Sequence, residues 1–217
     1  MRRLLITCLA LLTLGGCQNA YYAAMEKVGI HKRDILVDRV EDARDSQLEA
    51  KQQFKDALEQ YRSVVTVKGG ELEQRYDALS REYEASAASA REVRERITAV
   101  EDVAQALFDE WADELEQYSD RNLKQASARQ LSRTRAEYRT LIERMKAAEK
   151  RIDPVLNVLH DQVLYLKHNL NARAIGALHG EYRNLQSNVD RLLQDMQRSI
   201  DEADGFVKRL QSSRSPN

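Results

Sequence analysis

The sequence contains few of the residues that bend, cross-link or interrupt a polypeptide chain. Its 217 residues include only two cysteines, two prolines and eight glycines, and aromatic residues make up 6%. An average globular chain has about 7% glycine and about 5% proline. These low numbers exclude a disulfide framework and suit long, solvent-exposed helices around a narrow core. One elongated domain is the simplest interpretation.

The sequence also lacks the short motifs that usually carry catalysis. Lys68-Gly69-Gly70 does not have the residue order of a phosphate-binding loop, and there is no Cys-x-x-Cys, His-Glu-x-x-His or Gly-x-Ser-x-Gly pattern. His160 and His168 lie eight residues apart, about 80° around a helix, which is a poor spacing for metal ligands. We therefore expect no enzymatic activity, no metal and no cofactor.

Neither sign of charge dominates the chain. There are 34 basic and 35 acidic residues, and loss of a leader that contains Arg2 and Arg3 would leave 32 basic residues and a net charge of −3. Proteins that bind nucleic acid concentrate positive charge on one face. The overall balance therefore predicts no nucleic-acid partner.

The first sixteen residues form a predicted targeting segment. Two arginines, Arg2 and Arg3, precede an apolar run from Leu4 to Leu14, and Gly15 and Gly16 then lead to Cys17. This order of basic, apolar and small residues is typical of a secretory signal peptide. The apolar run is too short to remain in the membrane as a spanning helix.

Leu14, Gly15, Gly16 and Cys17 together resemble the lipobox of bacterial lipoproteins. The resemblance implies cleavage before Cys17, acylation of its thiol and amino group with chains such as palmitate, and no further free thiol in the mature chain. Gln18, in place of an aspartate, implies sorting to the outer membrane, with the body most simply facing the periplasm. Two or three acyl chains hold a protein on a membrane almost permanently. The alternative is an ordinary secreted protein in which Cys17 is incidental.

Apolar or small residues then recur along the chain in steps of four and three. One such seam runs from Leu72 to Trp111, a second from Leu131 to Leu166 and a third from Leu178 to Leu210. Steps that average 3.5 residues keep one stripe of a helix against its neighbours. The pattern predicts an all-α fold, an antiparallel up-down-up-down four-helix bundle or coiled coil, with helices at about 34–67, 70–118, 120–168 and 174–211.

Local signals refine these boundaries. Asp34 is predicted to cap the first bundle helix, and Ser119 or Asp120 the third. Pro154 lies inside the third predicted helix, but the heptad phase continues across it, which predicts a kink and no domain boundary. Residues 17–33 are expected to form the lipidated N-terminus, with a short helix at 20–28 ended by Gly29 and a basic connector. Residues 212–217 are expected to be a disordered tail.

The stretch YYAAMEKVGIHKRDILVDRVEDAR, which begins at Tyr21, resembles an uncharacterised family of proteobacterial helical lipoproteins, a domain of unknown function. The similarity extends over most of the mature chain. It implies the anchor and the helices, and it implies no catalytic residue.

Three polar residues of the first bundle helix occupy positions where apolar residues would be expected: Arg44, Gln47 and Lys51. The predicted register places them opposite the region of Ser86 and Ala90. Buried cations are costly unless they are paired. A local rotation would turn other side chains inward instead: Ala43, Leu48 and Ala50. Alternatively, the three polar residues form a polar groove beside small residues.

The predicted outer helices end level with Val100 and Tyr138, so residues 103–133 should project as a two-helix hairpin tip. Its most exposed apolar residues are candidate contacts for a partner: Phe108, Trp111, Leu115 and Leu123. In the alternative, the helix at 20–28 folds back and covers the tip with its apolar side: Tyr21, Tyr22, Met25 and Val28.

These features predict a non-enzymatic envelope lipoprotein that acts as a membrane-tethered spacer or adaptor for another envelope protein. The alternative is a periplasmic binding module that opens its bundle to hold lipid or another apolar ligand. Either function is compatible with a homo-oligomer.

Overall fold

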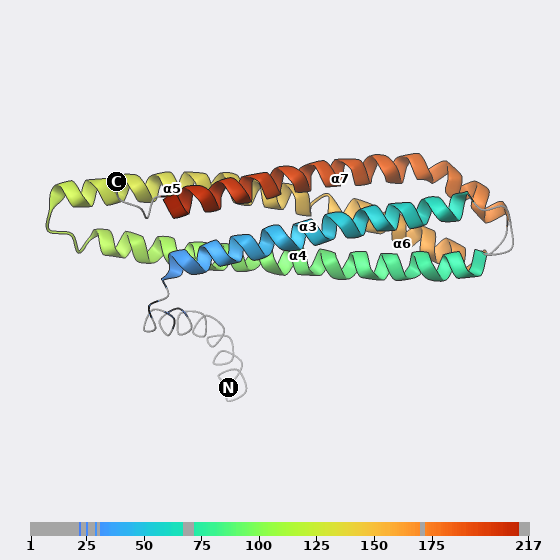
Figure 1. Ribbon diagram of the computed structural model, residues 1–217, viewed down its shortest axis with the longest axis horizontal. Helices are drawn as coiled ribbons and strands as arrows, with labels where there is room; N and C mark the ends of the chain where they lie inside the picture. Colours follow the sequence, from blue (N-terminus) through green and yellow to red (C-terminus); the bar gives the residue numbers. More distant parts are fainter. Residues whose placement is uncertain are drawn as a thin grey trace, which may run out of the picture.

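A computed structural model describes residues 31–66, 72–169 and 172–212, together with Tyr22, Met25 and Gly29. These residues form α3 (Lys32–Val65), α4 (Leu72–Leu115), α5 (Arg121–Glu149), α6 (Ile152–His168) and α7 (Ala172–Ser212), without any strand in the described ranges. The helices pack along one another as an elongated bundle (Figure 1). The predicted all-α bundle is confirmed.

Polar contacts between the helices show how neighbours are aligned. On one side of α3, Lys32 bonds to Glu110 and Gln53 to Glu82, so residue numbers rise in α3 as they fall in α4. On the other side, α3 meets α7 in the same reversed order, because Arg44 bonds to Asp204 and Tyr61 to the carbonyl of Leu178. The chain thus passes back and forth along the bundle (Figure 1).

A continuous apolar core runs along the bundle axis. Burying one Leu, Val or Phe side chain contributes about 1.5–3 kcal/mol, which is why each helix turns its seam inward. Residues with no exposed surface come from all the described helices: Leu36, Val40, Phe54 and Tyr61 of α3; Leu79, Ala90 and Val100 of α4; Leu141 and Met145 of α5; Ile152 and Leu166 of α6; and Leu178, Met196 and Phe206 of α7.

The third predicted helix, at 120–168, is two helices in the structure. The break falls at Lys150 and Arg151, before Pro154, and the Arg151 amide donates to the carbonyl of Ala148 in a tightened turn. Proline has no N–H to donate to the carbonyl four residues earlier, here that of Lys150, and its ring would clash with that carbonyl. In the first turn of α6, however, Pro154 is tolerated because amides there have no helical partner. The predicted kink is therefore a two-residue interruption at Lys150 and Arg151, both of which keep right-handed helical dihedral angles.

The helix starts agree with the sequence at one predicted cap and differ at the other. The carboxylate of Asp120 accepts hydrogen bonds from the amides of Asn122 and Leu123, at 2.7 and 3.0 Å, and so caps α5 as predicted. The first cap was misplaced, because α3 begins at Lys32 with His31 at the N-cap position. Asp34 lies in the first turn, where a carboxylate still interacts favourably with the helix dipole.

Gly29 has a φ of 85°, in the left-handed region that glycine adopts at low cost and that commonly ends helices. The rest of the predicted helix at 20–28, apart from Tyr22 and Met25, lies outside the described residues, as do the predicted leader and the tail after Ser212. Within the described part of the chain, no helix is both long enough and apolar enough to cross a membrane.

Tyr61 provides a test of the contact between α3 and α7. Its ring is fully buried, its hydroxyl donates to the Leu178 carbonyl at 3.0 Å, and burial raises its pKa above the ordinary value. We expect Tyr61→Phe to lower the free energy of unfolding by about 1 kcal/mol, the usual net value of one hydrogen bond, in urea titrations. Tyr118→Phe, in the exposed α4–α5 turn, is the control and should leave stability unchanged.

Candidate functional site

The end of α4 and the start of α5 project beyond the other helices as a two-helix tip (Figure 1). At its base, Lys32 Nζ lies 2.8 Å from Glu110 Oε1, so α3 begins level with Glu110. The last turn of α7 contributes Leu210 and Ser212 to a cavity of about 320 Å³ that Thr134 also lines. The projecting part, which we call the tip, is therefore residues 111–130. The predicted extent of 103–133 was too long.

Phe108 belongs to the core and not to a free surface. Its side chain is only 6% exposed, and its ring packs edge-to-face with the ring of Tyr138, with 5.4 Å between the ring centroids. Arg135 donates to its carbonyl at 2.9 Å and places the guanidinium over its ring. Burial, followed by the nearby carboxylates of Glu101 and Asp102, raises the pKa of Tyr138 to about 12. Phe108 is therefore not among the exposed residues of the tip, because α3 and α7 reach further along α4 and α5 than expected.

The other predicted contacts lie on the tip with graded exposure. Trp111 is half-buried, and its indole Nε1 donates to Ser127 Oγ at 2.9 Å, which ties α4 to α5. Leu115 is also half-buried, whereas Leu123 is 59% exposed. Tyr118, which is 41% exposed in the turn, was not among the predicted contacts. It lies one heptad after Trp111, the last residue of the seam, and this spacing could have identified it.

The helix at 20–28 was predicted, as an alternative, to cover the tip with four apolar residues, and the structure describes two of them, Tyr22 and Met25. Tyr22 is 6% exposed, and Lys32 Nζ lies 6.0 Å from the centre of its ring, while Met25 packs against the core. Tyr21 and Val28 lie outside the described residues. Tyr22 thus lies beside the start of α3, at the base of the tip, and Leu123 remains exposed.

The three polar residues predicted as a groove have different environments. Arg44 pairs with Asp45 at 2.9 Å and with Asp204 at 3.0 Å, and these carboxylates raise its pKa above the ordinary value. Lys51 bonds to Gln197. Both side chains therefore lie along the α3–α7 contact, where their charges have polar partners.

Gln47 instead points into the core. It has no exposed surface, and neither the nitrogen nor the oxygen of its side-chain amide has a hydrogen-bond partner among the described residues. Two further buried hydroxyls also lack partners within this part of the chain, those of Ser86 and Ser199. The expected rotation occurs in part, because Ala43 and Ala50 are buried, but Leu48 is 44% exposed and does not turn inward.

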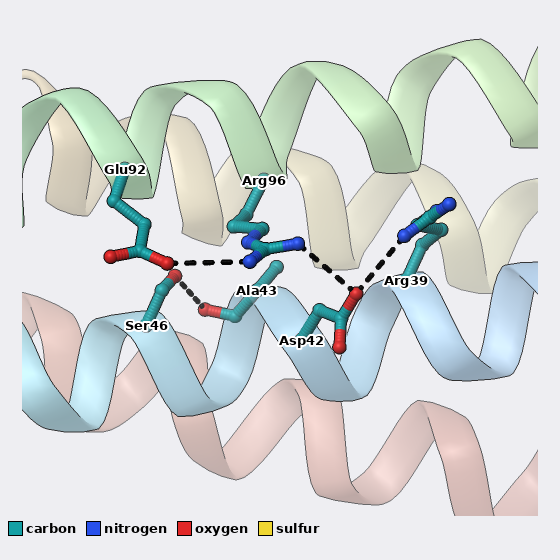
Figure 2. Close-up of polar contacts among 6 residues, drawn as sticks. All are labelled: Arg39, Asp42, Ala43, Ser46, Glu92 and Arg96. Carbon is teal, nitrogen blue, oxygen red and sulfur yellow. Dashed lines mark hydrogen bonds and ion pairs between the residues drawn. The ribbon is translucent and has the colours of Figure 1, made fainter.

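Close to Gln47, the α3–α4 contact is polar and well paired. Figure 2 shows Asp42 between two arginines, Arg39 at 3.2 Å and Arg96 at 3.4 Å, and Arg96 also meets Glu92. The same view shows Ser46 donating to the Ala43 carbonyl at 2.9 Å. Neighbouring polar groups are thus satisfied, which distinguishes them from Gln47.

The described residues contain no group of three His, Cys, Asp or Glu side chains that could hold a metal ion. The ring of His160 packs against the ring of Tyr83, with 5.2 Å between the ring centroids, and His168 is exposed at the end of α6. The two histidines are therefore not brought together as a pair of ligands.

Comparison with known proteins gives a family and no activity. Residues 21–210 match the family model described as "Protein of unknown function (DUF2959)". No curated protein and no solved structure matches the chain significantly.

Gln47 allows a test of the cost of its burial. We expect Gln47→Leu to raise the free energy of unfolding by about 1–3 kcal/mol, because it removes two unpartnered polar atoms from the core at similar volume. Urea unfolding followed by circular dichroism would measure the change. Gln52→Leu, at an exposed position of α3, is the control, and a loss of stability on Gln47→Leu alone would contradict the interpretation.

Proposed function

The chain belongs to the DUF2959 family of proteins of unknown function, and from its own residues we propose that it is a non-enzymatic, lipid-anchored spacer or adaptor of the cell envelope. Its partner would be another envelope protein that binds the tip. The observation that carries this proposal is an exposed apolar tip at the end of the bundle where the N-terminal chain enters.

The anchor would be Cys17, acylated after cleavage of the signal peptide, in an outer membrane and with the bundle in the periplasm. Lys32 lies fifteen residues after Cys17, a stretch that can span up to about 50 Å when extended. Because Lys32 contacts Glu110 at the base of the tip, an anchor at Cys17 would join the bundle at the same end as the tip.

The tip has the composition of a contact surface. Leu123 and Tyr118 are 59% and 41% exposed, and the half-buried Trp111 and Leu115 lie on the same two-helix tip. Two helices cannot bury such side chains between themselves, and exposed apolar patches usually mark interaction sites. A partner that covers them would remove this apolar surface from water.

The interhelical charges support a structural role over an enzymatic one. Arg94 pairs with Glu149, Arg151 with Asp195 and Lys146 with Glu101, so each holds neighbouring helices in register. The alternative function, a carrier of lipid or another apolar ligand, would require the bundle to open. Native mass spectrometry of protein purified in high salt distinguishes the two, because salt screens contacts with lipid headgroups and only a carrier would still retain lipid that is not covalently bound.

Removing the proposed acylation site tests the anchor. We expect Cys17→Ala to release the protein from the membrane fraction or to leave an uncleaved precursor, because no thiol would remain to be acylated before cleavage. Fractionation followed by immunoblotting and intact-mass measurement would show this. Cys8→Ala, inside the leader, is the matched control. Mature-sized Cys17→Ala protein in the outer membrane would refute the lipoprotein proposal.

Site-specific crosslinking tests the tip. A photo-crosslinking residue at Leu123 should capture a discrete envelope protein in cells, whereas one at Leu164, which is 46% exposed on α6, should not. We expect Leu123→Asp to reduce partner recovery at least about tenfold without changing the melting temperature, because a charge would be buried in the contact. Equal capture from Leu123 and Leu164 would contradict the proposal that the partner binds the tip.

A further inference from the structure

The helix α5 differs from the rest of the chain in charge. It has eight arginine or lysine residues and three glutamates, a net charge of +5, whereas the whole chain has a net charge of −1. The balance of the full sequence therefore conceals a strongly basic helix.

Part of this charge is used within the bundle. Lys124 pairs with Glu116 at 3.1 Å, Lys146 with Glu101, and Arg135 donates to the Phe108 carbonyl at 2.9 Å. Two of the glutamates also have partners on other helices, since Glu137 pairs with Arg209 and Glu149 with Arg94. These contacts lie on the sides of α5 that face α4 and α7.

The outward side of α5 is different. Between Gln125 and Ala147 it has four exposed arginines without an ion pair or hydrogen bond among the described residues: Arg129, Arg133, Arg139 and Arg144. At 100° per residue they fall within about 140° of the helix circumference, and at 1.5 Å per residue they extend over about 22 Å. We call them the arginine stripe. Only one carboxylate, that of Glu143, shares the exposed side between Gln125 and Ala147.

The side chains between these arginines are small. On the exposed side of α5 from Gln125 to Ala147, no apolar side chain is larger than alanine, and the remaining positions are mainly serine, threonine and alanine. Protein interfaces usually depend on buried aromatic or large apolar side chains, which this surface does not offer. Guanidinium groups bind phosphate through paired hydrogen bonds, and the small side chains between these arginines leave the guanidinium groups accessible to phosphate.

We propose that the arginine stripe binds the phosphate headgroups of anionic phospholipids, in the same membrane that holds the Cys17 anchor. This inference rests on the proposed anchor for its location, and on the exposed arginines for its chemistry. Clusters of arginine close to a membrane anchor add electrostatic attraction to the insertion of acyl chains. The stripe begins at the base of the tip, where Arg129 lies, so the anchor would bring it to the lipid surface.

The stripe and the apolar tip contact are separate surfaces. Leu123 lies outside the arc of the stripe, about 120° around α5 from Arg129 and about 60° from Arg144, which is the arginine nearest to it in angle. The protein can therefore contact lipid headgroups through the stripe and a protein partner through an adjacent face of the tip. Lipid contact along the stripe would lay the long axis of the bundle along the membrane, with α3 away from it, because α3 and α5 are both packed between α4 and α7.

The test uses the full-length lipidated protein, reconstituted into vesicles of phosphatidylcholine alone or with about one-third phosphatidylglycerol. A fluorophore is attached at Ala136→Cys, between the arginines, or at Gln52→Cys on the exposed side of α3. The lipids carry a quencher on their headgroups. We expect the α5 label to be quenched several-fold more strongly in the phosphatidylglycerol vesicles, and the α3 label to show no such difference.

Charge variants provide the matched comparison. Replacing the stripe with glutamine (Arg129→Gln, Arg133→Gln, Arg139→Gln and Arg144→Gln) should abolish the added quenching, as should about 0.5 M salt, which screens such contacts. The control removes the same charge from exposed positions of other helices (Arg62→Gln, Arg81→Gln, Arg91→Gln and Arg183→Gln) and should keep the quenching. Both variants should melt like the parent protein.

The failures are distinguishable. Equal quenching of the α5 label in both vesicles, or quenching that survives loss of the stripe, would overturn the lipid proposal while leaving the anchor intact. Binding of poly-glutamate through the stripe without added quenching would assign the stripe to an acidic protein instead. Protein that sediments only with phosphatidylglycerol vesicles would refute the anchor and support the stripe, and protein that sediments with neither would refute both.

Discussion

The structure depends on one continuous apolar seam that no helix can bury alone. Fixing each residue in a helix costs about 1–2 kcal/mol of backbone entropy, so a helix such as α4 is stable only with its apolar stripe against neighbours. The seam also constrains irregularities, because any interruption must keep the same side chains inward. The break between α5 and α6 meets this condition, since Ala148 and Ile152 on either side of it are both buried.

The helices could be predicted because a 3.5-residue spacing of apolar residues shows which side of each helix is buried. The helix boundaries at Pro154 and at the start of α3 differed from prediction because they depend on backbone hydrogen bonds, which this spacing does not specify. Pro154 acts on the carbonyl four residues before it, so the helix ends upstream of the proline. The start of α3 depends on which amide donors find the His31 carbonyl, a choice that the spacing of apolar residues cannot determine.

The tip was predictable in kind but not in extent. The hairpin follows from two seams on either side of the predicted cap at Ser119 or Asp120, whereas its exposed length depends on how far α3 and α7 extend. These ends reach about two turns further along α4 than predicted, which buries Phe108 and leaves Leu123 exposed. Similarly, Arg44 and Lys51 could not be placed from sequence, because their partners lie on α7, far along the chain.

The buried polar atoms are best understood through the same seam. A heptad pattern can slip by seven residues and still bury an apolar stripe, so apolar burial alone does not define one register. Arg44–Asp204 and Lys51–Gln197 flank Gln47 and place Ser199 near its level, among small side chains such as Ala50 and Ala203. After a slip, the long Gln47 side chain would meet larger neighbours. Its burial lowers stability but penalises the slipped arrangements more, which favours a single alignment of the helices.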